Sequence, residues 1–203
     1  MNTFIKTIEM VGIIAFAITG IYEARKKGMD IIGVYSVGMI TAFGGGSLRD
    51  IILARHPLFW IEHDGYTILL LVLSIVSMAT AKDIFSRKYM ATSVLALDAL
   101  GLGLFSASGA SVAMRAGCTL FVSSLLGVTT GVFGGVLRDI ICNEIPYVFQ
   151  RTELYATCAF IGAWAYLLVI GTTGNEVAAV ITCIVVTFAM RMLAIRYKIR
   201  LPL

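Results

Sequence analysis

Residues 41–52 read T-A-F-G-G-G-S-L-R-D-I-I, and residues 130–141 read T-G-V-F-G-G-V-L-R-D-I-I. The two segments lie 89 positions apart, and the same offset relates further residues without a gap from residue 9 to residue 66. The matched pairs outside the motif are Glu9 and Asp98, Gly12 and Gly101, Phe16 and Phe105, Gly20 and Gly109, Gly28 and Gly117, Gly38 and Gly127, Pro57 and Pro146, and Tyr66 and Tyr155. A collinear series of this length indicates an internal repeat.

The composition around this repeat is that of an integral membrane protein. Of the 203 residues, 59% are apolar and only 14% are charged, against roughly 45–50% and about 25% in soluble domains. This balance excludes a soluble domain, a disordered chain and a disulfide scaffold. The basic residues form no single run, which argues against a nucleic-acid partner. The cysteines have no C-x-x-C spacing and are predicted to be small apolar core residues; they are Cys118, Cys142, Cys158 and Cys183.

Apolar stretches predict an all-α polytopic membrane protein with seven transmembrane helices in a single domain, 1–203. The expected spans are 7–24, 29–54, 66–81, 89–110, 116–142, 154–172 and 177–195. Repeat one covers about 7–81 and repeat two about 89–172, while the seventh helix lies outside the repeat. Because each repeat holds three spans, the second copy enters the membrane from the opposite side, as in inverted-topology repeats.

The distribution of Lys and Arg predicts an orientation. One side holds Arg25, Lys26, Lys27, Lys82, Arg87, Lys88, Arg151, Arg191, Arg196, Lys198 and Arg200, and the other holds Lys6, Arg55 and Arg115. The excess of eleven basic residues over three predicts a protein of a prokaryotic inner membrane with its N-terminus outside and its C-terminus in the cytoplasm. The basic loop residues Arg25, Lys26, Lys27, Arg87 and Lys88 could also attract anionic lipid head groups.

The repeated glycine clusters are the first candidate site. They are Gly44, Gly45 and Gly46 in one copy and Gly134 and Gly135 in the other. Consecutive glycines weaken a helix by about 1 kcal/mol each, and broken helices in corresponding places of two inverted halves indicate a binding or permeation site. We expect a functional kink or unwound segment here. The alternative is close helix packing, which small residues permit.

Charged residues follow each cluster: Arg49 and Asp50, then Arg138 and Asp139. Intramembrane charges are costly and usually paired. Since neighbours on a helix point about 100° apart, we expect cross-pairing of Arg49 with Asp139 and of Arg138 with Asp50. These pairs could lock the two halves together, line a pore, or do both.

Two further carboxylates, Glu9 and Asp98, are equivalent by the repeat. They are expected either to cap helix N-termini, where the dipole favours them, or to attract cations at a pore mouth. Hydroxyls flank the glycines at Thr41, Ser47 and Thr130 and could coordinate a partly dehydrated cation, although such groups also bond to their own helix.

No enzyme, cofactor or bound metal is expected beyond transient monovalent cations. The sequence has no phosphate loop followed by Lys, no H-E-x-x-H and no T-V-G-Y-G filter. His56 and His63 share one short loop, where a solvated role is expected.

The repeated G-G-x-x-R-D motif with its downstream Pro, together with D-A-L-G-L-G-L-F at 98–105, resembles prokaryotic members of the TRIC (trimeric intracellular cation channel) family, which overlaps with the UPF0126 or "glycine transporter" domain proteins. The resemblance covers nearly the whole chain. It implies a homotrimer with one cation pathway in each protomer, between the second and fifth helices. By matching positions, both glycine clusters would be the kinks, and the two Arg-Asp pairs would flank the pathway.

We therefore expect a monovalent cation channel that passes K⁺ or Na⁺, K⁺ foremost. The first rival is a secondary transporter for a small zwitterion such as glycine, because inverted repeats with broken helices are also typical of carriers. The second rival is a structural or regulatory membrane subunit with a closed core.

Overall fold

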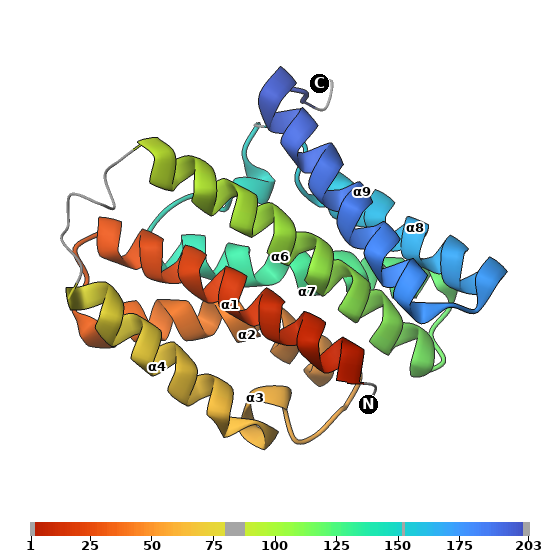
Figure 1. Cartoon of the computed structure of the whole chain (residues 1–203), viewed down its shortest axis with the longest axis horizontal. Coiled ribbons are helices and arrows are strands. Elements are labelled where there is room, and N and C mark those ends of the chain that lie inside the picture. Colours follow the sequence, from red (N-terminus) through yellow and green to blue (C-terminus); the bar gives the residue numbers. More distant parts are fainter. Residues whose placement is uncertain (1–2, 80–87, 152, 201–203) are drawn as a thin grey trace.

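The structure is a computed structural model that describes residues 3–79, 88–151 and 153–200. All its elements are helical within those residues (Figure 1). They are α1 (Thr3–Lys26), α2 (Ile31–Ile52), α3 (Phe59–Glu62), α4 (Asp64–Ala79), α6 (Lys88–Arg115), α7 (Leu120–Ile141), the 3-10 turn η1 (Tyr147–Phe149), α8 (Ala156–Thr173) and α9 (Glu176–Tyr197). The predicted all-α membrane fold is confirmed at this level.

Six of these helices are long and apolar enough to cross a membrane: α1, α2, α6, α7, α8 and α9. The third predicted span, 66–81, corresponds to α4, which has 16 residues. At 1.5 Å per residue the described part of α4 is about 24 Å long. Residues 80 and 81 of that span, and the predicted basic residues Lys82 and Arg87, lie outside the described residues.

Capping side chains explain why two helices begin later than predicted. Asp30 accepts a hydrogen bond from the Gly33 N–H at 2.8 Å, so that α2 begins at Ile31 rather than at residue 29. Thr119 caps α7 in the same way, through the Val122 N–H at 3.3 Å. Such side-chain oxygens satisfy N–H groups that the first helical turn leaves free. Asp30 and Thr119 are equivalent by the repeat.

The two pairs α1–α2 and α6–α7 form the centre of the molecule. α1 is antiparallel to α6, and α2 is antiparallel to α7. α1 lies along α6, and α2 lies along α7 (Figure 1). The rings of Phe16 and Phe105, which are equivalent by the repeat, meet with their centroids 5.1 Å apart. Glu9 of α1 contacts Ser108 of α6, while Thr19, further along α1, lies near Asp98, further back along α6. This order shows that the helices run in opposite directions.

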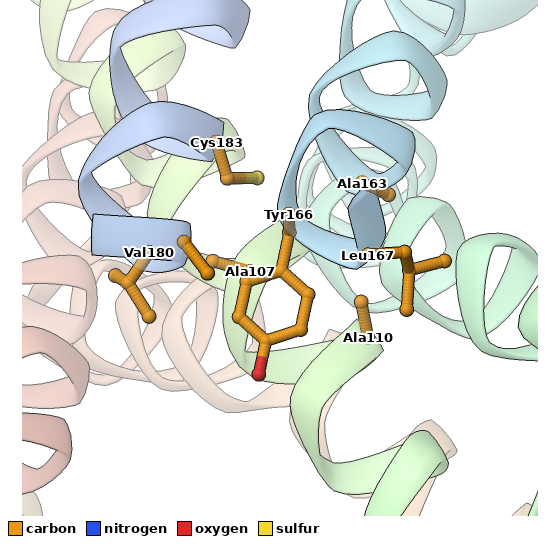
Figure 2. Packing of buried hydrophobic residues seen from close by; sticks show 8 residues of the cluster. Ala107, Ala110, Ala163, Tyr166, Leu167, Val180 and Cys183 are labelled. Atoms are coloured by element: carbon orange, nitrogen blue, oxygen red, sulfur yellow. The ribbon is translucent and has the colours of Figure 1, made fainter. Parts of the chain in front are cut away.

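The remaining helices pack on the two flanks of this centre. α4 contacts α1 and α2 on one side, and α8 and α9 contact α6 and α7 on the other. On the second flank, Tyr166 of α8 is fully buried beside Ala107 of α6 and Cys183 of α9 (Figure 2). Small residues on α6 let the Tyr166 ring fill the space between three helices, so α9 is attached firmly to the second half of the molecule.

Candidate functional site

The glycine clusters lie where α2 crosses α7. A Cβ atom added to Gly45 would stand 2.0 Å from the carbonyl oxygen of Thr130, and one added to Gly134 would stand 2.3 Å from that of Thr41. The two backbones therefore touch, and no side chain larger than hydrogen fits at either position. Gly45 and Gly134 are equivalent by the repeat, as are Thr41 and Thr130, so each glycine meets the threonine that begins the other copy of the motif.

Both helices remain α-helical through the glycines, so the expectation of an unwound segment was wrong. The physical reason is the crossing itself: close packing of the two backbones compensates for the poor helix propensity of glycine. Carbonyls in an unbroken helix stay bonded to N–H groups four residues along. They are not free to replace the hydration shell of an ion in this conformation.

The glycines within a cluster differ in their surroundings. A Cβ on Gly46 would meet only the Arg49 side chain, 3.9 Å away, and a Cβ on Gly135 would meet the Tyr155 hydroxyl at 3.3 Å. A Cβ on Gly44 would stand 2.7 Å from a methyl carbon of Leu137. Gly45 and Gly134 thus serve the crossing, whereas Gly46 and Gly135 face the charged groups beyond it.

The flanking hydroxyls are bonded to their own helices. Thr41 donates to the Val37 carbonyl at 2.6 Å, and Thr130 donates to the Leu126 carbonyl at 2.6 Å. Both side chains are buried and also contact a glycine of the neighbouring helix, Gly20 or Gly109. Ser47 is half-buried and borders a small cavity beside Glu9. In this conformation Thr41 and Thr130 are structural contacts of the crossing.

The intramembrane charges pair with their neighbours in sequence, so the predicted cross-pairing was wrong. Arg49 Nε lies 2.9 Å from Asp50 Oδ1, and Arg138 Nε lies 2.9 Å from Asp139 Oδ1. The long arginine side chain bends back far enough to overcome the 100° between neighbouring positions. Because α2 and α7 are antiparallel, the two Arg-Asp pairs stand at opposite ends of the bundle.

Each arginine also reaches a hydroxyl of the other half. Arg49 Nη1 contacts Ser108 Oγ on α6 at 3.2 Å, and Arg138 Nη1 contacts Thr19 Oγ1 on α1 at 3.2 Å. Ser108 and Thr19 are themselves 89 positions apart. Sequence reasoning missed both residues, although the repeat offset places a hydroxyl at both positions and was signal enough to find them.

The carboxylates Glu9 and Asp98 belong to the same two groups of residues. Ser108 donates to Glu9 Oε1 at 2.9 Å, and Arg138 Nη1 lies 3.0 Å from Asp98 Oδ1. Both carboxylates are buried, at 6% and 7% exposure, six residues after the start of α1 and ten after the start of α6. The expectation that they cap helix N-termini was therefore wrong.

We define the Arg49 cluster as Glu9, Arg49, Asp50 and Ser108, and the Arg138 cluster as Asp98, Arg138, Asp139 and Thr19. A cavity of about 490 Å³ borders the Arg49 cluster, and one of about 190 Å³ borders the Arg138 cluster. These two cavities share no lining residue. The contact of α2 with α7 lies between them.

The loop after α7 adds contacts that the first half lacks. The Tyr147 N–H donates to Asp139 Oδ2 at 2.9 Å. Arg191 of α9, which is almost fully buried, places its guanidinium 4.8 Å from the Tyr147 ring and 5.0 Å from the Tyr155 ring. It also donates to the Leu154 carbonyl at 2.9 Å. The cation–π contacts hold this loop over the Arg138 cluster, a role for Arg191 that the sequence did not reveal.

One ion pair outside the spans joins the two halves at the same end. Lys27, in the turn after α1, is bonded to Glu144, which follows α7. The bond raises the pKa of Lys27 above its ordinary value and lowers the pKa of the Glu144 carboxyl below its own. At the other end, Arg55 lies 3.7 Å from Asp50 and is half-exposed. The four cysteines are free thiols, and the described residues hold no group of three or more His, Cys, Asp or Glu that could bind a metal ion.

Comparison with known proteins gives a consistent result. The family model described as "Glycine transporter" matches residues 6–82 and 95–170. The UPF0126 inner membrane protein YadS of Escherichia coli K12 is 34% identical over 196 residues, which are 96% of this chain and 93% of that protein.

Two solved structures are similar along almost the full length of the chain. One comes from work on conductance through TRIC cation channels: it is 36% identical, has a TM-score of 0.87, and the match covers 98% of this chain and 96% of that one. The other is the TRIC trimeric intracellular cation channel orthologue from Rhodobacter sphaeroides, at 30% identity and a TM-score of 0.88, with 97% and 99% covered.

Proposed function

We propose that this chain, which belongs to the family described as "Glycine transporter" and matches UPF0126 membrane proteins, is a monovalent cation channel of a prokaryotic inner membrane. The observation that carries the proposal is the similarity to TRIC cation channels over nearly the whole chain, at 30–36% identity. The same relatives are channels or membrane proteins and belong to no enzyme family, which agrees with a chain that is not an enzyme.

The pathway would run inside each protomer along α2 and α7. Its two ends would be the cavities beside the Arg49 and Arg138 clusters, and its closed middle would be the crossing at Gly45 and Gly134. Backbone contact at this crossing supports a closed conformation. Conduction would then require the two helices to move apart, which would open a kink at the glycine clusters and free carbonyls and threonine hydroxyls to replace part of the hydration shell of K⁺ or Na⁺.

The charges suit a cation of low charge. Each cluster carries two carboxylates and one arginine, so each end of the pathway is acidic, as is typical of cation channels. The arginines temper this potential and hold the carboxylates in place. Because no ring of aligned carbonyls is expected, selectivity for K⁺ over Na⁺ should be modest.

In the membrane the chain would form seven spans, with α4 as the third and α9 as the seventh, and two inverted repeats. The antiparallel packing of α1 with α6 and α2 with α7 supports the inversion. The predicted orientation places the N-terminus outside, the Arg49 cluster at the outer end and the Arg138 cluster at the cytoplasmic end. Three protomers would assemble as in the trimeric orthologue, and the cytoplasmic basic residues would contact anionic lipid head groups.

The test is single-channel recording of the purified protein in a planar bilayer under asymmetric KCl. We expect unitary currents that reverse near the K⁺ equilibrium potential. Gly46→Leu should lower the unitary conductance several-fold, since its side chain would enter the pathway from a position with open space. Gly171→Leu is the matched control, because nothing lies within 4 Å of its Cβ position on α8. Equal currents from both variants would place the pathway elsewhere.

The second candidate is a carrier for glycine or another small zwitterion. The description of the matching family favours it, and the two Arg-Asp pairs offer a cation for a substrate carboxylate and an anion for its ammonium group. Saturable uptake of labelled glycine into proteoliposomes, coupled to a proton or sodium gradient and without unitary currents, would replace the channel by the carrier.

A further inference from the structure

One oxygen atom of Glu9 has no partner. Among the described residues, the buried side-chain atoms without a hydrogen bond are five hydroxyl oxygens and a single carboxylate oxygen, Glu9 Oε2. A hydroxyl satisfies itself by rotating its proton toward any nearby acceptor. A carboxylate oxygen carries part of a full negative charge and needs a donor or a cation. Burying it without either is costly, and Glu9 is 94% buried.

Asp98, the repeat equivalent of Glu9, does not share this deficit. Its Oδ1 lies 3.0 Å from Arg138 Nη1, a direct ion pair. In the Arg49 cluster the corresponding guanidinium contacts Ser108 Oγ, with Arg49 Nη1 3.2 Å from it, and the Ser108 hydroxyl in turn donates to Glu9 Oε1. The charge of Asp98 is therefore neutralised by contact, whereas the charge of Glu9 is not.

The other cations that border the cavities beside Glu9 and whose side chains the structure describes are already engaged. Arg49 and Arg55 both pair with Asp50, at 2.9 and 3.7 Å. Arg115, which borders the same space, is bonded to Glu176. The remaining titratable groups that line the cavity of about 490 Å³ at this end are Glu62, His56 and His63. No described side chain supplies the positive charge that Glu9 Oε2 lacks.

Glu9 stands where several cavities meet. It lines the cavity of about 490 Å³ beside the Arg49 cluster, a second cavity of about 400 Å³ between α1, α6 and α9, and a small one of about 20 Å³ that reaches Gly46 and Ser47. The large cavities give access from the end of the bundle, and the small one leads toward the crossing. A charge at this junction faces any cation on its way to the α2–α7 contact.

We infer that Glu9 Oε2 and Ser108 Oγ form a discrete binding site for a monovalent metal cation, K⁺ or Na⁺, and that the opposite end of the protein has no matching site at Asp98. A divalent ion is disfavoured because Ca²⁺ takes six to eight oxygen ligands, usually including several carboxylates, and Glu9 Oε2 is the one buried carboxylate oxygen without a partner among the described residues. The inference rests on the proposed function for its role: the site concentrates cations at one mouth of the pathway.

Glu9→Gln is the test variant, because it keeps the shape and removes the charge, and Asp98→Asn is its matched counterpart. Two measurements separate the site from the channel. The first is the thermal unfolding midpoint Tm in detergent as KCl replaces N-methyl-D-glucamine chloride at constant ionic strength. A cation that binds the folded state raises Tm. We expect a rise in the wild type and in Asp98→Asn, and none in Glu9→Gln.

The second measurement is unitary conductance against KCl concentration on the side that the Arg49 cluster faces. Glu9→Gln should lower conductance several-fold at low KCl and hardly at all at high KCl, where binding is saturated. An equal Tm rise in wild type and Glu9→Gln would overturn the site. A silent wild-type bilayer with a Glu9-dependent Tm rise would retain the site and refute the channel. If Glu9→Gln does not fold, Ser108→Ala replaces it in both measurements with the same expected losses.

Discussion

The Arg49 and Arg138 clusters are built from equivalent positions, yet they are satisfied in different ways. Arg138 contacts two carboxylates directly, Asp98 at 3.0 Å and Asp139 at 2.9 Å. Arg49 contacts one carboxylate and reaches the other through Ser108. The second cluster is also covered by the loop that Arg191 holds. The difference shows that a repeat preserves the positions of charges while the surrounding contacts decide how strongly each charge is neutralised.

A large loss of stability is expected where the two halves touch, at the crossing of α2 with α7. Gly45→Ala and Gly134→Ala each place a methyl group within 2.3 Å of a backbone carbonyl oxygen that cannot rotate away. Each should destabilise the protein by about 3 kcal/mol or more. The free energy of unfolding in mixed micelles measures this loss.

Gly46→Ala is the control for this pair, since its methyl group has open space and alanine favours a helix by up to about 1 kcal/mol. If Gly45→Ala were as stable as Gly46→Ala, the backbone contact at the crossing would be refuted.

Replacing the arginine should destabilise the protein by a different amount in each cluster. Arg138→Gln leaves Asp98 and Asp139 buried without a cation, and breaking such a pair costs about 3–5 kcal/mol. Arg49→Gln should cost less, because Asp50 keeps Arg55 within 3.7 Å. Denaturation curves of the two variants measure the difference, and an equal loss would mean that the clusters are equally neutralised.

Removing the hydroxyl in each cluster should give the opposite order, with the larger loss of stability in the Arg49 cluster. Ser108→Ala removes the hydroxyl that bridges Arg49 and Glu9, so two buried polar groups lose a partner, at a cost of about 1–3 kcal/mol. Thr19→Val should cost about 1 kcal/mol or less, since Arg138 keeps both carboxylates. The same denaturation assay applies. A greater loss from Thr19→Val would show that Ser108 does not carry the coupling.

The smallest effect is a pH dependence of stability at the end of the bundle that holds the Arg138 cluster. The lowered pKa of Glu144 means that its contribution to stability is present above the ordinary carboxyl value of 4.5 and is lost as pH falls through the lower folded value. The pKa of Lys27 is raised. The contribution of Lys27 to stability is therefore fully present below its ordinary pKa of 10.5 and is lost as pH rises through its higher pKa in the folded state. Tm measured from about pH 7 to about pH 3 should fall slightly more for the wild type than for Glu144→Gln. Parallel curves would show that this exposed pair adds nothing.

Much of the fold follows from the sequence because hydrophobicity and the offset of 89 residues act over long segments. The helices, their approximate limits and the equivalence of Glu9 with Asp98 can all be read in this way. The third predicted span, 66–81, overlaps α4 (Asp64–Ala79), and its last two residues lie outside the described ones.

The candidate site was less predictable because it depends on side-chain reach and backbone contact. The helix angle of 100° suggested that Arg49 and Asp50 could not meet, but it ignores the length and bend of an arginine. Glycine propensity indicated a broken helix, yet propensity does not include the packing energy gained when Gly45 touches Thr130. Arg191 could not be assigned because its partners Tyr147 and Tyr155 lie about 40 positions away in sequence.

The contact of Phe16 with Phe105 has a consequence for the origin of the molecule. Phe16 meets its own counterpart, Phe105, and the contacts of Arg49 with Ser108 and of Arg138 with Thr19 are the same contact in the two copies of the repeat. An interface in which one surface patch binds a copy of itself is isologous, the kind that two identical chains form around a two-fold axis. The contacts at the centre of this protein thus follow, within one chain, the pattern of an isologous dimer interface, and α9 lies outside the two repeated segments.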